Sequence, residues 1–188
     1  IRDRAADLGY IIHCGNYNWI NHLKTLILLR HAKSDWDDPT RHDHDRPLNK
    51  RGERDAPAMG NFLREKGVIP DLIVSSTALR AKTTAEAVAT GAGYDPAEIV
   101  FRKELYLPPV ETLLSTTKRL PKDKEKVMLV AHNPGITSFL ATITGNYQTV
   151  PEMPTCAVAV LELDGEWEAA ARGAFNFKAF YTPKKDLF

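Results

Sequence analysis

The chain has 188 residues, of which 43% are hydrophobic and 26% are charged, as is ordinary for a globular protein with one full hydrophobic core. Its 25 Lys and Arg residues nearly balance its 24 Asp and Glu residues, so net charge does not favour nucleic acid or a membrane surface as a partner. No apolar run is long enough to span a bilayer, and the two cysteines form no ligand-spaced cluster. We therefore expect a cytoplasmic protein that binds neither nucleic acid nor membrane.

Residues 1–23 differ in character from the rest of the chain. Polar and aromatic residues are interleaved there without a helical or strand period, and the cationic start and apolar run of a secretory signal are missing. We expect this segment to be an extension outside a single domain formed by residues 24–188. The alternative is an extra element that packs on the domain through apolar residues such as Trp19 and Ile20.

From Lys24 onward, strand-like and helix-like segments alternate. Thr25–Leu29 is a short apolar run, typical of a strand that is buried on both faces. A helix is then expected between Asn49, a favourable N-cap residue, and Gly67, because apolar residues recur there every three or four positions.

The later elements continue the alternation. We expect strands at 71–76, 98–102 and 126–132, and helices over 78–89, from Pro108 onward, and from Asn133 to near Gly145. The chain closes with "CAVAVLEL" (156–163) and "EWEAAARGAF" (166–175), which predict an antiparallel hairpin around Asp164 and Gly165. The pattern predicts a three-layer α/β fold, in which helices cover both faces of a mostly parallel central sheet.

Three of the expected strands are followed by side chains that could bind a ligand or take part in catalysis. The first is followed by Arg30 and His31, and another is followed by His132 and Asn133. The strand at 71–76 leads to Arg80, about one turn into the next helix. Because ligands of such sheets bind at the carboxyl ends of the strands, we expect these groups to form one cationic pocket. Such a pocket, with helix N-termini beside it, suits a dianionic phosphoryl group.

The same groups predict a reaction. A neutral imidazole can attack phosphorus, and neighbouring cations favour the neutral form by lowering the pKa of the ring. His31 would then carry the phosphoryl group covalently until water removes it. Arg30, Arg80 and His132 would hold the phosphoryl oxygens during transfer. Because the protein supplies this positive charge, we expect neither a metal nor another cofactor.

Three motifs carry a family resemblance: "LILLRHAKSDW" (26–36), "LIVSSTALRAKTTAEA" (72–87) and "VMLVAHNPG" (127–135). In this order they resemble the histidine phosphatase (phosphoglycerate mutase-like) superfamily, and "RHAKS" resembles its SixA branch of phosphohistidine phosphatases. The resemblance implies the phosphoglycerate mutase-like fold. It also implies that His31 is the nucleophile and that Arg30, Arg80 and His132 bind phosphate.

The resemblance also implies further site residues, and for the proton donor it leaves several candidates. Ser34 stands where the family often has a Thr near the phosphate, and Asn133 follows the second histidine. For the proton donor, Glu104 is the best positional match, and Glu111 and Asp35 are its rivals. A phosphoramidate makes weaker demands on an acid than an ester does, so the branch also allows a site without a strict proton donor.

Two loops admit functional and structural interpretations. "HDHD" (42–45) has the residue types of a metal site, but alternating residues in a proline-flanked loop rarely converge on one ion, so no metal is predicted there. Arg46 lines the pocket mouth in one interpretation and is a solvated loop cation in the other. The basic run at 118–126 is expected to be a solvated helix end and loop.

The chain length between the motifs bears on the substrate. The segment from Arg80 to His132 has little material beyond its expected helices and strand, whereas the resemblance implies that sugar-phosphate mutases carry longer insertions there. An open pocket suits phosphohistidine on another protein. The alternatives are a general phosphomonoesterase that acts on a small phosphate ester and a phosphohistidine-binding module with weak turnover.

Overall fold

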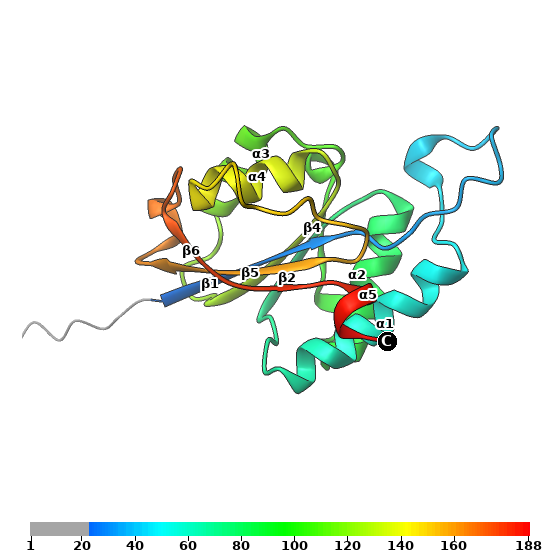
Figure 1. The fold of residues 1–188 in the computed structure, drawn as a ribbon, viewed down its shortest axis with the longest axis horizontal. Helices are drawn as coiled ribbons and strands as arrows, with labels where there is room; N and C mark the ends of the chain where they lie inside the picture. The colour runs from blue at the N-terminus through cyan, green and yellow to red at the C-terminus, as the bar shows by residue number, and fades with distance from the viewer. Residues whose placement is uncertain (1–22) are drawn as a thin grey trace, which may run out of the picture.

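A six-stranded sheet runs through the middle of the computed structural model, which describes residues 23–188 (Figure 1). The order across the sheet is β3-β2-β4-β1-β5-β6. β1 to β4 are parallel to one another, whereas β5 runs antiparallel to both β1 and β6. The strands are β1 Leu23–Arg30, β2 Leu72–Ser76, β3 Val100–Arg102, β4 Lys126–Ala131, β5 Val158–Asp164 and β6 Phe175–Tyr181.

β1 begins at Leu23, one residue before the predicted start of the domain. The rest of the predicted extension, residues 1–22, lies outside the described residues. No helix within residues 23–188 combines the length and apolar character that crossing a membrane requires.

Helices cover both faces of the sheet, as the alternating pattern predicts (Figure 1). One face packs against α1 (Lys50–Glu65) and α2 (Leu79–Ala92), and the other packs against α3 (Val110–Lys118) and α4 (Gly135–Thr144). A short α5 (Pro183–Asp186) follows β6 near the end of the chain. Four 3-10 helices lie in the connections: η1 Asp43–Asp45, η2 Pro96–Glu98, η3 Lys103–Leu105 and η4 Trp167–Ala169.

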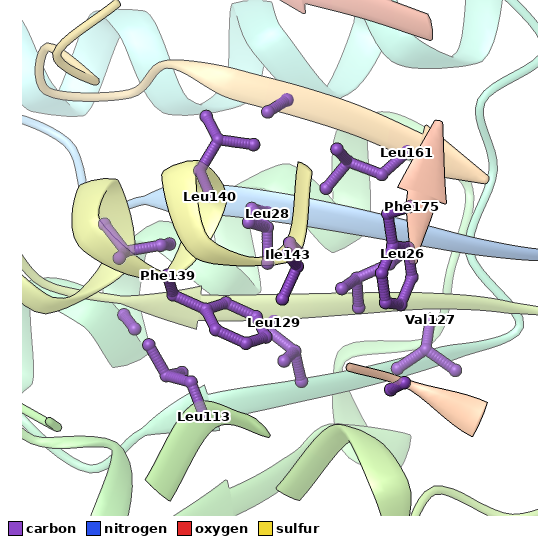
Figure 2. Packing of buried hydrophobic residues seen from close by; sticks show 14 of the residues in the cluster. Leu26, Leu28, Leu113, Val127, Leu129, Phe139, Leu140, Ile143, Leu161 and Phe175 are labelled. Atoms are coloured by element: carbon purple, nitrogen blue, oxygen red, sulfur yellow. The ribbon is translucent and has the colours of Figure 1, made fainter. Parts of the chain in front are cut away.

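The two faces of β1 belong to different parts of the core, because successive side chains of a strand point to opposite sides. Leu26 and Leu28 pack with the α3 and α4 side, whereas Ile27 and Leu29 pack with the α1 and α2 side. Figure 2 shows the core on the α3 and α4 side, where the apolar side chains of α4 lie over β1 and β4. All four β1 residues are fully buried, which fixes the strand that carries the first site motif.

The predicted caps of two helices are confirmed. The side chain of Asn49 accepts a hydrogen bond from the backbone of Gly52, which starts α1 one residue after the cap. Gly145 ends α4 in the left-handed conformation with a φ of 68°, which glycine adopts without strain.

The C-terminal hairpin is confirmed as a pairing of β5 with β6, but its predicted second strand was wrong. The prediction placed that strand at 166–175, whereas β6 begins at Phe175. The residues after Gly165 form η4 instead, in which Trp167 is fully buried and donates a hydrogen bond from Nε1 to the carbonyl of Lys124 at 2.8 Å. Burial of this large ring therefore delays strand pairing by several residues.

Candidate active site

The register of the sheet brings the two predicted site histidines together. Arg30, the last residue of β1, pairs with Ala131, the last residue of β4, so His31 and His132 leave adjacent strands at the same level. The centroids of their rings are 4.8 Å apart. Ser76 ends β2 on the other side of β4, and its Oγ lies 2.8 Å from Nε2 of His132.

A hollow of about 360 Å³ opens at the carboxyl ends of β1 and β4, where His31 and His132 lie. It contains seven of the predicted site residues but none of the three proton-donor candidates Glu104, Glu111 and Asp35. Its lining residues are Arg30, His31, Lys33, Ser34, Trp36, Asp43, Arg46, Arg80, Leu107, His132, Asn133 and Thr155. The strand ends therefore form one pocket with a strong excess of cationic and imidazole groups.

His31 is held as a neutral imidazole with one nitrogen available. Its Nδ1 lies 2.8 Å from the carbonyl oxygen of Ala32, which can only accept, so Nδ1 carries the proton and Nε2 keeps its lone pair. Burial is the main cause that lowers the pKa of His31 to about 4. The Ala32 contact opposes this shift, and the positive charges of Arg80 and Arg30 add to it. The lone pair on Nε2 accepts a hydrogen bond from Nε of Arg80 at 3.4 Å.

Arg30 contributes a second guanidinium from the end of β1. Its NH1 group donates to the carbonyl oxygen of Met153 at 2.7 Å, which fixes the side chain at the pocket wall. Its Nε is buried and has no hydrogen-bond partner within residues 23–188. A buried donor is normally paired, so this nitrogen is a candidate donor to a bound anion.

His132 is almost completely enclosed at the end of β4. Burial, followed by the nearby His31 and Arg80, lowers the pKa of its ring to about 2. Nε2 of the ring is engaged with Ser76, while Nδ1 is buried with no partner in the described part of the chain. An arriving anion would offset the surrounding positive charge and favour the protonated ring.

Arg46 lies at the pocket wall and is buried, so the interpretation as a solvated loop cation is wrong. Its NH2 group donates to Oγ of Ser34 at 2.9 Å, and its Nε donates to the carbonyl oxygen of Asp35 at 2.8 Å. The guanidinium also lies over the ring of Trp36, with Cζ 3.1 Å from the ring centroid. Arg46 therefore links the segment after His31 to the loop that precedes α1.

Known proteins are similar to this chain in both sequence and structure. The profile of the histidine phosphatase superfamily (branch 1) matches residues 26–106. An uncharacterized chloroplastic protein of Arabidopsis thaliana is 31% identical over 180 residues, which cover 88% of this chain and 80% of that protein. A solved structure from Agrobacterium tumefaciens, named as a candidate phosphohistidine phosphatase SixA, is 31% identical with a TM-score of 0.73, over 85% of this chain and 98% of that one. A second structure with that description, from Nakamurella multipartitia, is 28% identical with a TM-score of 0.75, over 86% and 96% of the two chains.

The chain belongs to the histidine phosphatase superfamily. The likeness to the SixA structures extends over nearly their whole length, so this histidine phosphatase is of the SixA type. Its sheet, with four parallel strands and an antiparallel C-terminal pair, is the phosphoglycerate mutase-like fold that the resemblance implied.

The phosphatase also has a pocket residue that the sequence analysis did not assign to the site, Asp43. Its carboxylate accepts hydrogen bonds from Arg80 at 2.9 Å, from Arg46 at 2.9 Å and from the hydroxyl of Tyr106 at 2.6 Å. Burial acts to raise the pKa of Asp43, but the Tyr106 hydrogen bond, the Arg80 hydrogen bond and charge, and the Arg46 bond outweigh it and bring the pKa to about 2. Asp43 is therefore an ionised anchor for both guanidinium groups.

This placement also accounts for the "HDHD" segment. Asp43 points to Arg80 and Arg46, whereas the ring of His44 contacts Thr77 through Nε2 at 3.0 Å and Asp45 through Nδ1 at 3.1 Å. Within residues 23–188, no group of three or more His, Cys, Asp or Glu side chains could hold a metal ion. The signal that could have revealed Asp43 is an acidic residue three positions before a pocket arginine.

The structure gives no support to the predicted proton donors. Glu104 lines a different hollow, together with Leu72 at the opposite end of β2 and Pro121 beyond α3. Glu111 is exposed on α3, and the carboxylate of Asp35 accepts a hydrogen bond from the backbone of Asp37. Asn133 does reach the pocket, where its Nδ2 donates to the carbonyl oxygen of Met153 at 3.1 Å.

Proposed function

We propose that this histidine phosphatase removes the phosphoryl group from phosphohistidine on a protein, with His31 as its covalent nucleophile. Nε2 of His31 carries the lone pair that would attack phosphorus, because the Ala32 contact keeps the proton on Nδ1. Attack forms an Nε2–P bond as the bond between phosphorus and the substrate imidazole breaks. Water then cleaves the Nε2–P bond, which releases inorganic phosphate and restores His31.

The pocket supplies positive charge for both steps. Arg30, Arg80 and a His132 ring protonated in the presence of the anion would hold the non-bridging oxygens, whose charge changes during a loose transition state. Arg80 is already directed at the reaction centre by its two contacts with Asp43, one to the carboxylate and one to the backbone carbonyl. Asp43 is thus a positioning residue in this proposal.

The observation that carries the choice of phosphohistidine is the ionisation of the pocket carboxylate. Among the lining residues of the pocket, Asp43 is the only carboxylate, and its pKa of about 2 leaves it without a proton to donate at neutral pH. An alkyl phosphate ester needs a proton on its departing oxygen. A phosphohistidine can leave as neutral imidazole once its own ring is protonated, so it does not need an acid from the enzyme.

The openness of the pocket agrees with a protein substrate. Trp36 is 71% exposed and Leu107 is 50% exposed, although both line the hollow that contains His31. Large apolar side chains at the mouth of a charged pocket are typical of surfaces that meet another protein. A small ester would gain few contacts beyond its phosphoryl group and so would have little remote binding energy to lower the barrier.

The proposal is tested by comparing substrates that differ in leaving group and size. We expect kcat/KM for a phosphohistidine carrier domain to exceed that for common sugar phosphates by at least about tenfold, which is about 1.4 kcal/mol of transition-state binding. A chromogenic aryl phosphate, whose phenol leaves without a strong acid, should fall between them. A sugar phosphate that outperforms the carrier domain would favour the alternative of a general phosphomonoesterase. Binding of the carrier without turnover would favour a phosphohistidine-binding module.

A further inference from the structure

A second hollow, of about 520 Å³, lies beside the active-site pocket. Thr155 lines both hollows, so the two adjoin at this residue. The walls of the second hollow come from the start of α1, from Pro154 and Thr155, and from the segment 182–188 around α5. We call this hollow the α1–α5 groove.

The α1–α5 groove carries an excess of positive charge. Arg51, Arg54 and Lys184 line it, whereas Asp55 is its only acidic lining residue in the described chain. The side chain of Asp55 is 5% exposed, and one of its oxygens accepts two hydrogen bonds from Arg54, at 3.0 and 2.8 Å. The other oxygen of Asp55 lies 3.9 Å from Nε of Arg51, so this one carboxylate is shared by two guanidinium groups and the groove keeps a net positive charge.

Arg51 connects the groove to the active site. Its NH2 group donates to Oγ1 of Thr155 at 3.1 Å, while 54% of its side chain stays exposed. On the other side of Thr155, Lys33 lines the active-site pocket. A chain that leaves the pocket over Thr155 thus passes from Lys33 to Arg51 and then to Lys184.

The position of Arg51 is unfavourable for the helix itself. Lys50 and Arg51 are the first two residues of α1, and the positive end of a helix dipole disfavours cations in that turn. Residues that destabilise the element in which they lie are found preferentially at functional sites. Cations at this end of α1 are better explained by binding of negative charge than by stabilisation of the helix.

We propose that the α1–α5 groove binds an acidic segment of the substrate protein, next to its phosphohistidine. This proposal rests on the proposed function and assigns a recognition role to residues that do not touch the phosphoryl group. Charge complementarity, and the wall at Thr155 that the groove shares with the pocket, select an acidic segment as the occupant. Pro183 and Phe188 add apolar surface, on which the aliphatic parts of such side chains can pack.

The test compares two synthetic phosphohistidine peptides, one flanked by glutamates and one by glutamines at the same positions. The wild-type enzyme should have a kcat/KM at least about fivefold higher for the glutamate peptide, and added salt should reduce this preference because it screens exposed charges. The double variant Arg51→Gln, Lys184→Gln should lose the preference. Its kcat/KM for a chromogenic phosphate ester, which does not reach the groove, should stay within about twofold of wild type.

Arg64→Gln is the matched control, because Arg64 is an exposed arginine on the same helix, about 20 Å from Arg51 by the rise of an α-helix. This variant should keep the preference. Equal turnover of both peptides by wild type, or an unchanged preference in the double variant, would overturn the groove assignment and leave the proposed function intact. Turnover of the chromogenic ester but of neither peptide would overturn both.

Discussion

At the scale of single residues, His31 combines burial with a fixed proton position. The ring sits at the end of a buried strand among three arginines, so a second proton on it would be strongly disfavoured. The Ala32 carbonyl at 2.8 Å selects the tautomer with the proton on Nδ1. In the proposed mechanism the site would therefore present a neutral nucleophile without the help of a general base.

This arrangement predicts an acid-shifted titration of His31. The pKa of about 4 lies below the ordinary value of 6.5, so the ring stays neutral as the pH falls through 6.5 and gains its proton only near pH 4. Nuclear magnetic resonance of enzyme labelled with ¹⁵N-histidine should show this midpoint for the free enzyme, with His31→Asn used to identify the signal. A midpoint at or above 6.5 would mean that the arginines and burial do not hold the ring neutral.

The residues after the strands were predicted from sequence, whereas the contact between Asp43 and Arg80 was not. Arg30, His31 and His132 are set by strand ends, and parallel strands bring such ends to one edge of the sheet. Asp43 belongs to a 3-10 turn in the loop before α1, and its contact with Arg80 arises only when that loop folds over the start of α2. Glu104 was placed by position along the chain alone, which does not tell which way a short 3-10 turn directs its side chains.

At the scale of elements, the contact between α1 and α2 has unusually little space. A side chain added at Gly60 would meet the carbonyl oxygen of Val88, and one added at Gly91 would meet the backbone of Pro57 and Asn61. These contacts involve backbone atoms, which cannot move aside as a flexible side chain can. The two glycines thus let α1 and α2 pack closely on the face of the sheet that they share.

Gly91→Ala should therefore destabilise the protein, although alanine is the better helix former. The new Cβ would lie 2.7 Å from the carbonyl oxygen of Pro57 and 2.8 Å from the nitrogen of Asn61, so the helices would have to separate. We expect the free energy of unfolding to fall by about 1–3 kcal/mol in denaturant titrations, as for other overpacked sites. The neighbouring Thr90→Ala, on an exposed position of α2, should change it by less than about 0.5 kcal/mol. Equal stabilities of Gly91→Ala and wild type would show that the contact can relax.

At the scale of the whole molecule, the pocket around His31 and the α1–α5 groove lie side by side, because Thr155 lines both. The alternation of strands and helices correctly predicted that the strand ends meet in one pocket, because it fixes the direction of the parallel strands and the layers around them. The same pattern misplaced β6, because the burial of Trp167 depends on tertiary packing that local hydrophobic periodicity does not reveal. The groove depends on packing of the C-terminal segment against α1, which is likewise a tertiary feature.

The most direct test of the account is the site of the covalent phosphoryl group. Wild-type enzyme quenched during turnover of a ³²P-labelled substrate should carry acid-labile, base-stable phosphate on His31. His31→Asn should carry none and should lose at least about a thousandfold in turnover, as removal of a covalent nucleophile does. His42→Asn, which changes an exposed imidazole outside the pocket, should keep both the label and the activity. Label on another residue such as Ser34, or full turnover by His31→Asn, would contradict the mechanism.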